Sequence, residues 1–160
     1  MAEKHVFGPV DVTLPPGTTR ADLEFYGVDH FCPSYVARVY FDDPDVDADS
    51  ASEERESYAG RFAIFGHQRC FGDEGHCVAH EHLRRFDDRP SHPLTRAFKR
   101  VVVTDALRRR GDAGPLTVTV VVTADPAEVE GREEDLLRFE GLQLTTFAAP
   151  ALEAGPEPPA

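Results

Sequence analysis

A short stretch near the middle of the chain gathers side chains that bind transition metals. Its spacing, H-x2-C-x5-H-C-x2-H-x-H, matches no standard zinc finger, yet imidazole and thiolate are the ligands that zinc and copper prefer. The two cysteines favour Cu(I) over harder ions. The pattern indicates a copper site, with zinc as the alternative metal, and the candidate ligands are His67, Cys70, His76, Cys77, His80 and His82.

The same residues have simpler interpretations. Cys70 and Cys77 are placed to close a short loop as a disulfide, or to be buried as small apolar side chains, with the histidines as ordinary polar surface. Asp73 and Glu74 lie between glycines, where their carboxylates cap backbone amides in a tight turn. A third interpretation is a small metal-dependent enzyme with an open coordination position. For a thiol nucleophile, no oxyanion turn or third partner can be assigned, so we expect no catalytic residues.

Composition limits the possible partners. The 160 residues suit a single domain, and 29 acidic against 17 basic residues leave a formal charge of −12. That charge repels nucleic acid and anionic membrane surfaces, so we expect neither as a partner. The first residues have no apolar signal-peptide core, which predicts a cytoplasmic protein unless it is exported with a partner.

Alternating apolar residues predict strands rather than helices along most of the chain. Residues 1–20 are interpreted as an N-terminal lead-in, residues 21–148 as one domain, and residues 149–160 as a disordered Pro/Ala-rich tail. Thr104 or Asp105 is expected to cap one short helical turn that ends at Gly111. The fold prediction is an all-β antiparallel sandwich or Greek-key barrel with long loops, including a solvated acidic loop at 42–57. The predicted strands are 21–28, 35–41, 60–64, 98–103, 116–123 and 136–147, the last with a bulge at Gly141.

Two long segments carry a family resemblance. YAGRFAIFGHQRCFGDEGHC at 58–77 and RRFDDRPSHPLTRAFKRVVVTDAL at 84–107 resemble the C-terminal β-domain that follows the dicopper domain in bacterial tyrosinase-family proteins. The segments at 35–49 and 138–147 fit the same pattern, so the resemblance covers residues 21–147. That domain is similar to the C-terminal part of plant polyphenol oxidases and, more distantly, to the haemocyanin β-sandwich.

The resemblance implies an accessory role rather than phenol oxidation, because the two histidine triplets of a dicopper centre are absent from this sequence. Such domains shield a type-3 copper site, dock to it, or help to load it with copper. The matching residues His67, Cys70, His76 and Cys77 would then handle copper, and Phe71, with Asp73 and Glu74, would face the partner. The alternatives are a structural interaction module stapled by Cys70 and Cys77, and a small copper or zinc enzyme using the 67–82 cluster.

Overall fold

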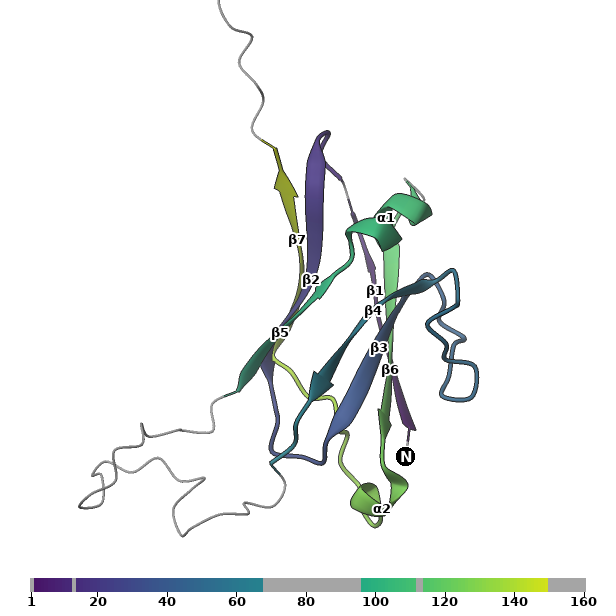
Figure 1. Ribbon diagram of the computed structural model, residues 1–160, viewed down its shortest axis with the longest axis vertical. Helices are drawn as coiled ribbons and strands as arrows, with labels where there is room; N and C mark the ends of the chain where they lie inside the picture. The colour runs from purple at the N-terminus through teal and green to yellow at the C-terminus, as the bar shows by residue number, and fades with distance from the viewer. Residues whose placement is uncertain (1, 13, 68–95, 112–113, 150–160) are drawn as a thin grey trace, which may run out of the picture.

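Two antiparallel sheets pack face to face in the computed structural model (Figure 1). The structure describes residues 2–12, 14–67, 96–111 and 114–149. The four-stranded sheet, here sheet A, has the order β1-β6-β3-β4, and the three-stranded sheet B has the order β5-β2-β7. The described strands form two open sheets and no closed barrel, so the predicted β-sandwich is confirmed in preference to the barrel. The strands are β1 (Ala2–Val10), β2 (Thr18–Val28), β3 (Tyr35–Phe41), β4 (Tyr58–Ile64), β5 (Ala97–Val102), β6 (Leu116–Ala124) and β7 (Gly141–Ala148), with short helices α1 (Thr104–Arg110) and α2 (Pro126–Val129).

The core lies between the sheets and follows the alternation of the sequence. Every second residue of β3 and β6 points inward, so that one parity of each strand is buried. From sheet B, Leu23 and Phe25 of β2 meet Phe62 and Ile64 of β4 across the interior. None of the helices in the described ranges is both long and apolar enough to cross a lipid bilayer.

The acidic loop at 42–57 covers the outer face of sheet A. Val46 is buried against Tyr40 and Val121, two side chains that point away from the main core. Two N–H groups of Arg55 and the Ser57 hydroxyl all donate to Asp43 Oδ2 and hold this carboxylate at the base of the loop. The loop is therefore an ordered cover with a solvated acidic exterior.

Asp43 is expected to make the free energy of unfolding depend on pH. The hydrogen bond from Ser57, followed by those from Arg55, lowers the pKa of the Asp43 carboxyl. We expect Asp43→Asn to lower the free energy of unfolding by about 1–2 kcal/mol at neutral pH, because charge-assisted hydrogen bonds are lost. A lowered pKa gives stability that is present above the unfolded carboxyl's pKa and disappears as pH falls through the folded value. In urea titrations, the difference between the two proteins should therefore shrink below about pH 4. The exposed Asp45→Asn is the control, and a deficit that persists at low pH would contradict the role of the charge.

The first strand lies within residues 1–20, the segment interpreted from the sequence as a lead-in to the domain. Ala2–Val10 pairs with β6 along its length, and β2 already begins at Thr18. Most side chains of this edge strand are at least partly exposed, so it has little hydrophobic period for sequence reasoning to detect. Its place is fixed by the backbone ladder and by Glu3 and Phe7, which contact the segment before β7.

The last predicted strand, 136–147, is also wrong in its first part. Only Gly141–Ala148 is strand, and Leu136 and Leu137 are buried side by side. Two consecutive buried residues do not fit the alternation of a strand with one buried face. The Glu3 carboxylate accepts the Leu136 N–H at 2.8 Å and the Leu137 N–H at 3.4 Å, which stabilises an irregular path in place of a bulged strand.

Helix α1 confirms the predicted helical turn, but its start differs from the expectation. Val103 is the N-cap residue and makes no side-chain cap, while Gly111 ends the helix. The Thr104 hydroxyl instead accepts the Ala21 N–H at 2.9 Å, so this side chain joins the helix to β2. A sequence pattern does not reveal that a backbone donor 83 residues away competes for the hydroxyl.

Candidate functional site

The structure places one of the predicted metal ligands, His67, and brings it beside a histidine that the sequence analysis missed. His67 lies just after β4, and His30 lies in the connection from β2 to β3. Their rings have centroids 5.1 Å apart at an interplanar angle of 71°. The remaining predicted residues, Cys70, Phe71, Asp73, Glu74, His76, Cys77, His80 and His82, lie outside the described residues.

Backbone contacts hold the two histidines together. The His67 N–H donates to the His30 carbonyl at 2.8 Å, and the Gly66 N–H donates to the Ser34 hydroxyl at 3.1 Å. Gly66 lies so close to the Cys32 and Pro33 backbone that a Cβ atom at this position would overlap it. The end of β4 is thus fastened to the 30–34 loop, and a glycine is needed where the two segments meet.

The two imidazoles have the features of metal ligands. His30 Nε2 and His67 Nδ1 are buried and have no hydrogen-bond partner among the described residues. An unpaired buried nitrogen is costly unless a ligand occupies its lone pair. The separation of 5.1 Å between the ring centroids is that of an edge-to-face ring pair, which ranges over about 4.5–7 Å, and it is also short enough for two imidazoles to share one ion.

Two histidines are an incomplete ligand set. Across the ranges that the structure describes, no group of three or more histidine, cysteine, aspartate or glutamate side chains is arranged to hold an ion. A tetrahedral site takes four ligands, so this pair would supply half of them. Among the described residues, the pair is therefore an incomplete candidate site for copper or zinc.

One exposed aromatic ring contacts the histidine pair, and a second exposed phenylalanine follows His30 in the chain. Phe65 has 80% of its surface exposed, and its ring contacts that of His67 edge-on at 5.6 Å between centroids. Phe31, next to His30 in the chain, is 57% exposed. Sequence alternation hints at Phe65, because it follows the inward-facing Ile64, but it does not show that this ring contacts the histidine pair. Exposed rings of this size are typical of a surface that contacts a partner.

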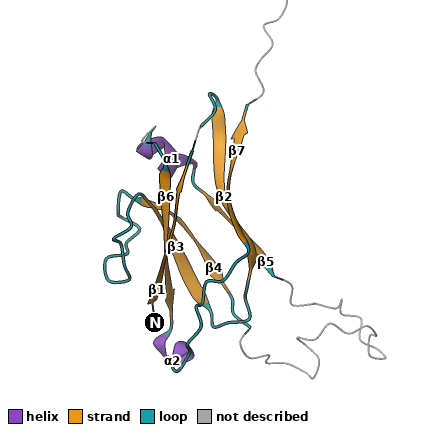
Figure 2. Ribbon diagram, turned by 180° about the vertical axis from the view of Figure 1, so that it is seen from behind, coloured by secondary structure: helices purple, strands orange, loops and turns teal. Residues whose placement is uncertain are grey.

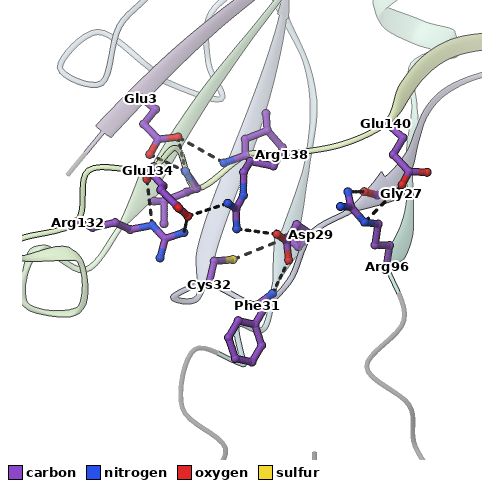
Figure 3. A network of polar contacts seen from close by, with 12 residues as sticks. Glu3, Gly27, Asp29, Phe31, Cys32, Arg96, Arg132, Glu134, Arg138 and Glu140 are labelled. Carbon is purple, nitrogen blue, oxygen red and sulfur yellow. Dashed lines mark hydrogen bonds and ion pairs between the residues drawn. The ribbon is translucent and has the colours of Figure 1, made fainter. Parts of the chain in front are cut away.

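Cys32 is buried beside a network of polar contacts that includes Asp29 and Arg138 (Figure 3). Its Sγ lies 3.8 Å from the Asp29 carbonyl oxygen, and the Asp29 carboxylate is paired with Arg138 at 2.6 Å. Burial, reinforced by Asp29, raises the pKa of the Cys32 thiol to about 11. The group is thus a neutral thiol at physiological pH, unsuited to act as a nucleophile or a thiolate ligand.

A separate hollow lies between the base of the acidic loop and α1. It has a volume of about 630 Å³ and is lined chiefly by charged side chains. Arg110 is bonded to the Asp42 carboxylate and to two backbone carbonyls, and Arg55 is bonded to Asp43. Because these lining groups are already paired, the hollow is explained as a structural junction and is a weaker candidate than the histidine pair.

No protein-family model and no curated protein sequence matches this chain. The assignment of function therefore depends on the residues themselves, and the resemblance to tyrosinase C-terminal domains stays a prediction.

Proposed function

We propose that this protein is a non-catalytic accessory domain that docks to a type-3 copper oxidase of the tyrosinase kind and shields its copper site or helps to load it. The observation that carries the proposal is the His30–His67 pair, whose two buried nitrogens have no partner among the described residues. The pair lies immediately before the cysteine- and histidine-rich segment in the chain. The β-sandwich and the sequence resemblance support the same proposal.

In this proposal copper is a cargo bound by this chain and passed to the partner. His30 Nε2 and His67 Nδ1 would hold the ion from two separate segments. The hydrogen bond from the His67 N–H to the His30 carbonyl keeps these segments together. Cys70 and Cys77 follow in the sequence and are the proposed sources of softer thiolate ligands, with His76, His80 and His82 as further imidazole candidates. Soft thiolates retain Cu(I), while imidazoles suit either oxidation state, so a mixed set favours transfer to a site built from histidines.

Copper titration of the purified, reduced protein tests this function. We expect one tightly bound Cu(I), and an affinity about tenfold to a hundredfold lower in either His30→Ala or His67→Ala, because each removes a ligand. Since protons compete with metal for the imidazole nitrogen, copper affinity should also weaken in acid.

The matched control is His5→Ala. His5 lies on β1, stacked against Phe7 and near Glu3, and belongs to no metal site in this proposal. Its replacement should leave copper affinity unchanged. Absence of copper binding by the wild-type protein would reject the copper role and leave a docking module. Equal binding by all three variants would instead reject His30 and His67 as the ligands. A tyrosinase-type partner that is neither bound nor activated by the wild-type chain would reject the accessory role.

A further inference from the structure

The outer faces of the two sheets differ in what covers them. The acidic loop folds over sheet A and buries Val46 against it. Among the described residues, no segment lies across the outer face of sheet B, and Figure 2 shows β5, β2 and β7 on the side of the sandwich away from that loop. We call this uncovered surface the sheet B face, defined by the outward side chains of these three strands.

The sheet B face displays large apolar side chains. Tyr26, Phe98, Val102 and Phe147 are each between 40% and 56% exposed, and they come from all three strands. Phe98 stacks obliquely against Tyr26 with ring centroids 5.1 Å apart. Scattered exposed apolar residues are ordinary, but a group gathered on one sheet face is typical of an interaction surface.

The polar groups of the face are already paired with one another. Asp22 is fully buried beneath two arginines, with its carboxylate 2.8 Å from Arg20 Nε and 3.6 Å from Arg100 Nε. Glu24 accepts hydrogen bonds from the Tyr26 and Thr145 hydroxyls. Two arginines and two carboxylates make the face neutral, and preformed pairs lower the cost of removing it from water.

The negative charge of the chain lies elsewhere. Residues 42–57 contain eight acidic residues and one arginine, a net charge of −7, and residues 125–135 contain six and one, a net of −5. Together these two loops account for the whole formal charge of −12, so the rest of the chain is neutral on balance. The 42–57 loop lies over the opposite sheet, and α2 of the second loop lies at one end of the sandwich (Figure 1).

We propose that the sheet B face binds the same face of a second copy of this chain, forming a two-fold symmetric dimer. A basic partner would be drawn to the acidic loops and not to a neutral face. Two copies that each carry a charge of −12 repel one another, so contact is most favourable through a neutral, apolar surface. Two-fold packing of the sheet B faces meets this condition and keeps both 42–57 loops on the outside of the dimer.

Sedimentation equilibrium over a wide range of protein concentration, in the presence of EDTA, tests the dimer. The chelator excludes association bridged by metal through the histidine-rich segment. We expect a monomer–dimer equilibrium that strengthens as NaCl rises from about 0.05 M to about 0.5 M, because salt screens the repulsion between the acidic loops. Phe98→Asp should weaken dimerisation about 30-fold or more, since it places an unpaired carboxylate in the interface.

Two further variants keep the test decisive. Val102→Asp lies on the same face, is 56% exposed, and serves if Phe98→Asp fails to fold. Val10→Asp is the matched control, because Val10 is 48% exposed on β1 of sheet A and should leave the dimer intact. A wild-type protein that stays monomeric at every concentration and salt level would overturn the proposal, as would a dimer that survives both sheet B substitutions.

Discussion

Replacing Gly66 with alanine is expected to lower the free energy of unfolding by at least about 3 kcal/mol, a large share of a typical domain's stability. A Cβ atom at this position would overlap the Cys32 carbonyl oxygen and the Pro33 carbonyl group, both of which are backbone atoms. A flexible side chain can move aside at little cost, but here either the end of β4 or the 30–34 loop must shift. Urea denaturation measures the loss.

The same substitution should also disturb the histidine pair. Gly66 precedes His67, whose N–H donates to His30, so moving the backbone pulls the two imidazoles apart. Under the proposed function, copper affinity should fall even in protein that remains folded. Gly141→Ala is the control, because a Cβ there meets only the Tyr26 side chain at 3.9 Å, an ordinary contact. Equal stability of the two variants would show that the 30–34 loop yields more easily than its packing suggests.

Strands with one buried face were predictable from the sequence. The residues that face the core are apolar, so apolar and polar residues alternate along these strands. The boundaries of β3 agree with the prediction from Tyr35 to Phe41, and β6 extends the predicted strand 116–123 by one residue, to Ala124. These strands lie in the interior of sheet A, where each has a neighbour on both sides. A central strand must bury one face fully, and this requirement makes every second residue of its sequence apolar.

The edge strand β1 and the segment before β7 were not predictable, because neither has the alternating burial of a central strand. β1 has no buried residue, and the segment before β7 buries Leu136 and Leu137 consecutively, so neither shows the alternation of a strand with one buried face. Both also depend on polar contacts between positions far apart in the chain. Glu3 accepts the backbone N–H of Leu136 across 133 residues, and neither partner carries a local sign of the other. A polar contact of this kind leaves no periodic pattern to read.

In the candidate site too, residues close together in the sequence were predictable and residues joined only by the fold were not. The cluster of residue types around His67 was visible in the sequence, because metal ligands close together in the chain form a recognisable pattern. His30 could not be identified in this way, because it lies 37 residues before His67. It joins the site only because the β2–β3 connection contacts the end of β4. Phe31 and Phe65 join it for the same topological reason, at one end of the sandwich.

Replacing Phe25 with alanine should cost about 3–5 kcal/mol of stability, as is typical of truncating a buried aromatic residue. Phe25 is fully buried, and its ring contacts Phe62 of β4 at 4.8 Å and Phe139 of the irregular segment at 5.4 Å between centroids. It therefore joins sheet B, sheet A and the segment that leads into β7. Losing the ring leaves a cavity where sheet B, sheet A and the irregular segment meet. Because the strand ladders fix both sheets, little collapse can fill it.

Phe65→Ala provides the comparison for Phe25→Ala, since it removes the same side chain from an 80% exposed position. It should change stability by no more than about 0.5 kcal/mol, because the ring loses little burial. Paired urea unfolding curves then separate the loss of core packing from the loss of an aromatic residue as such. A Phe25→Ala cost close to that of Phe65→Ala would mean that the two sheets are held together mainly by their strand connections and not by the aromatic contacts between them.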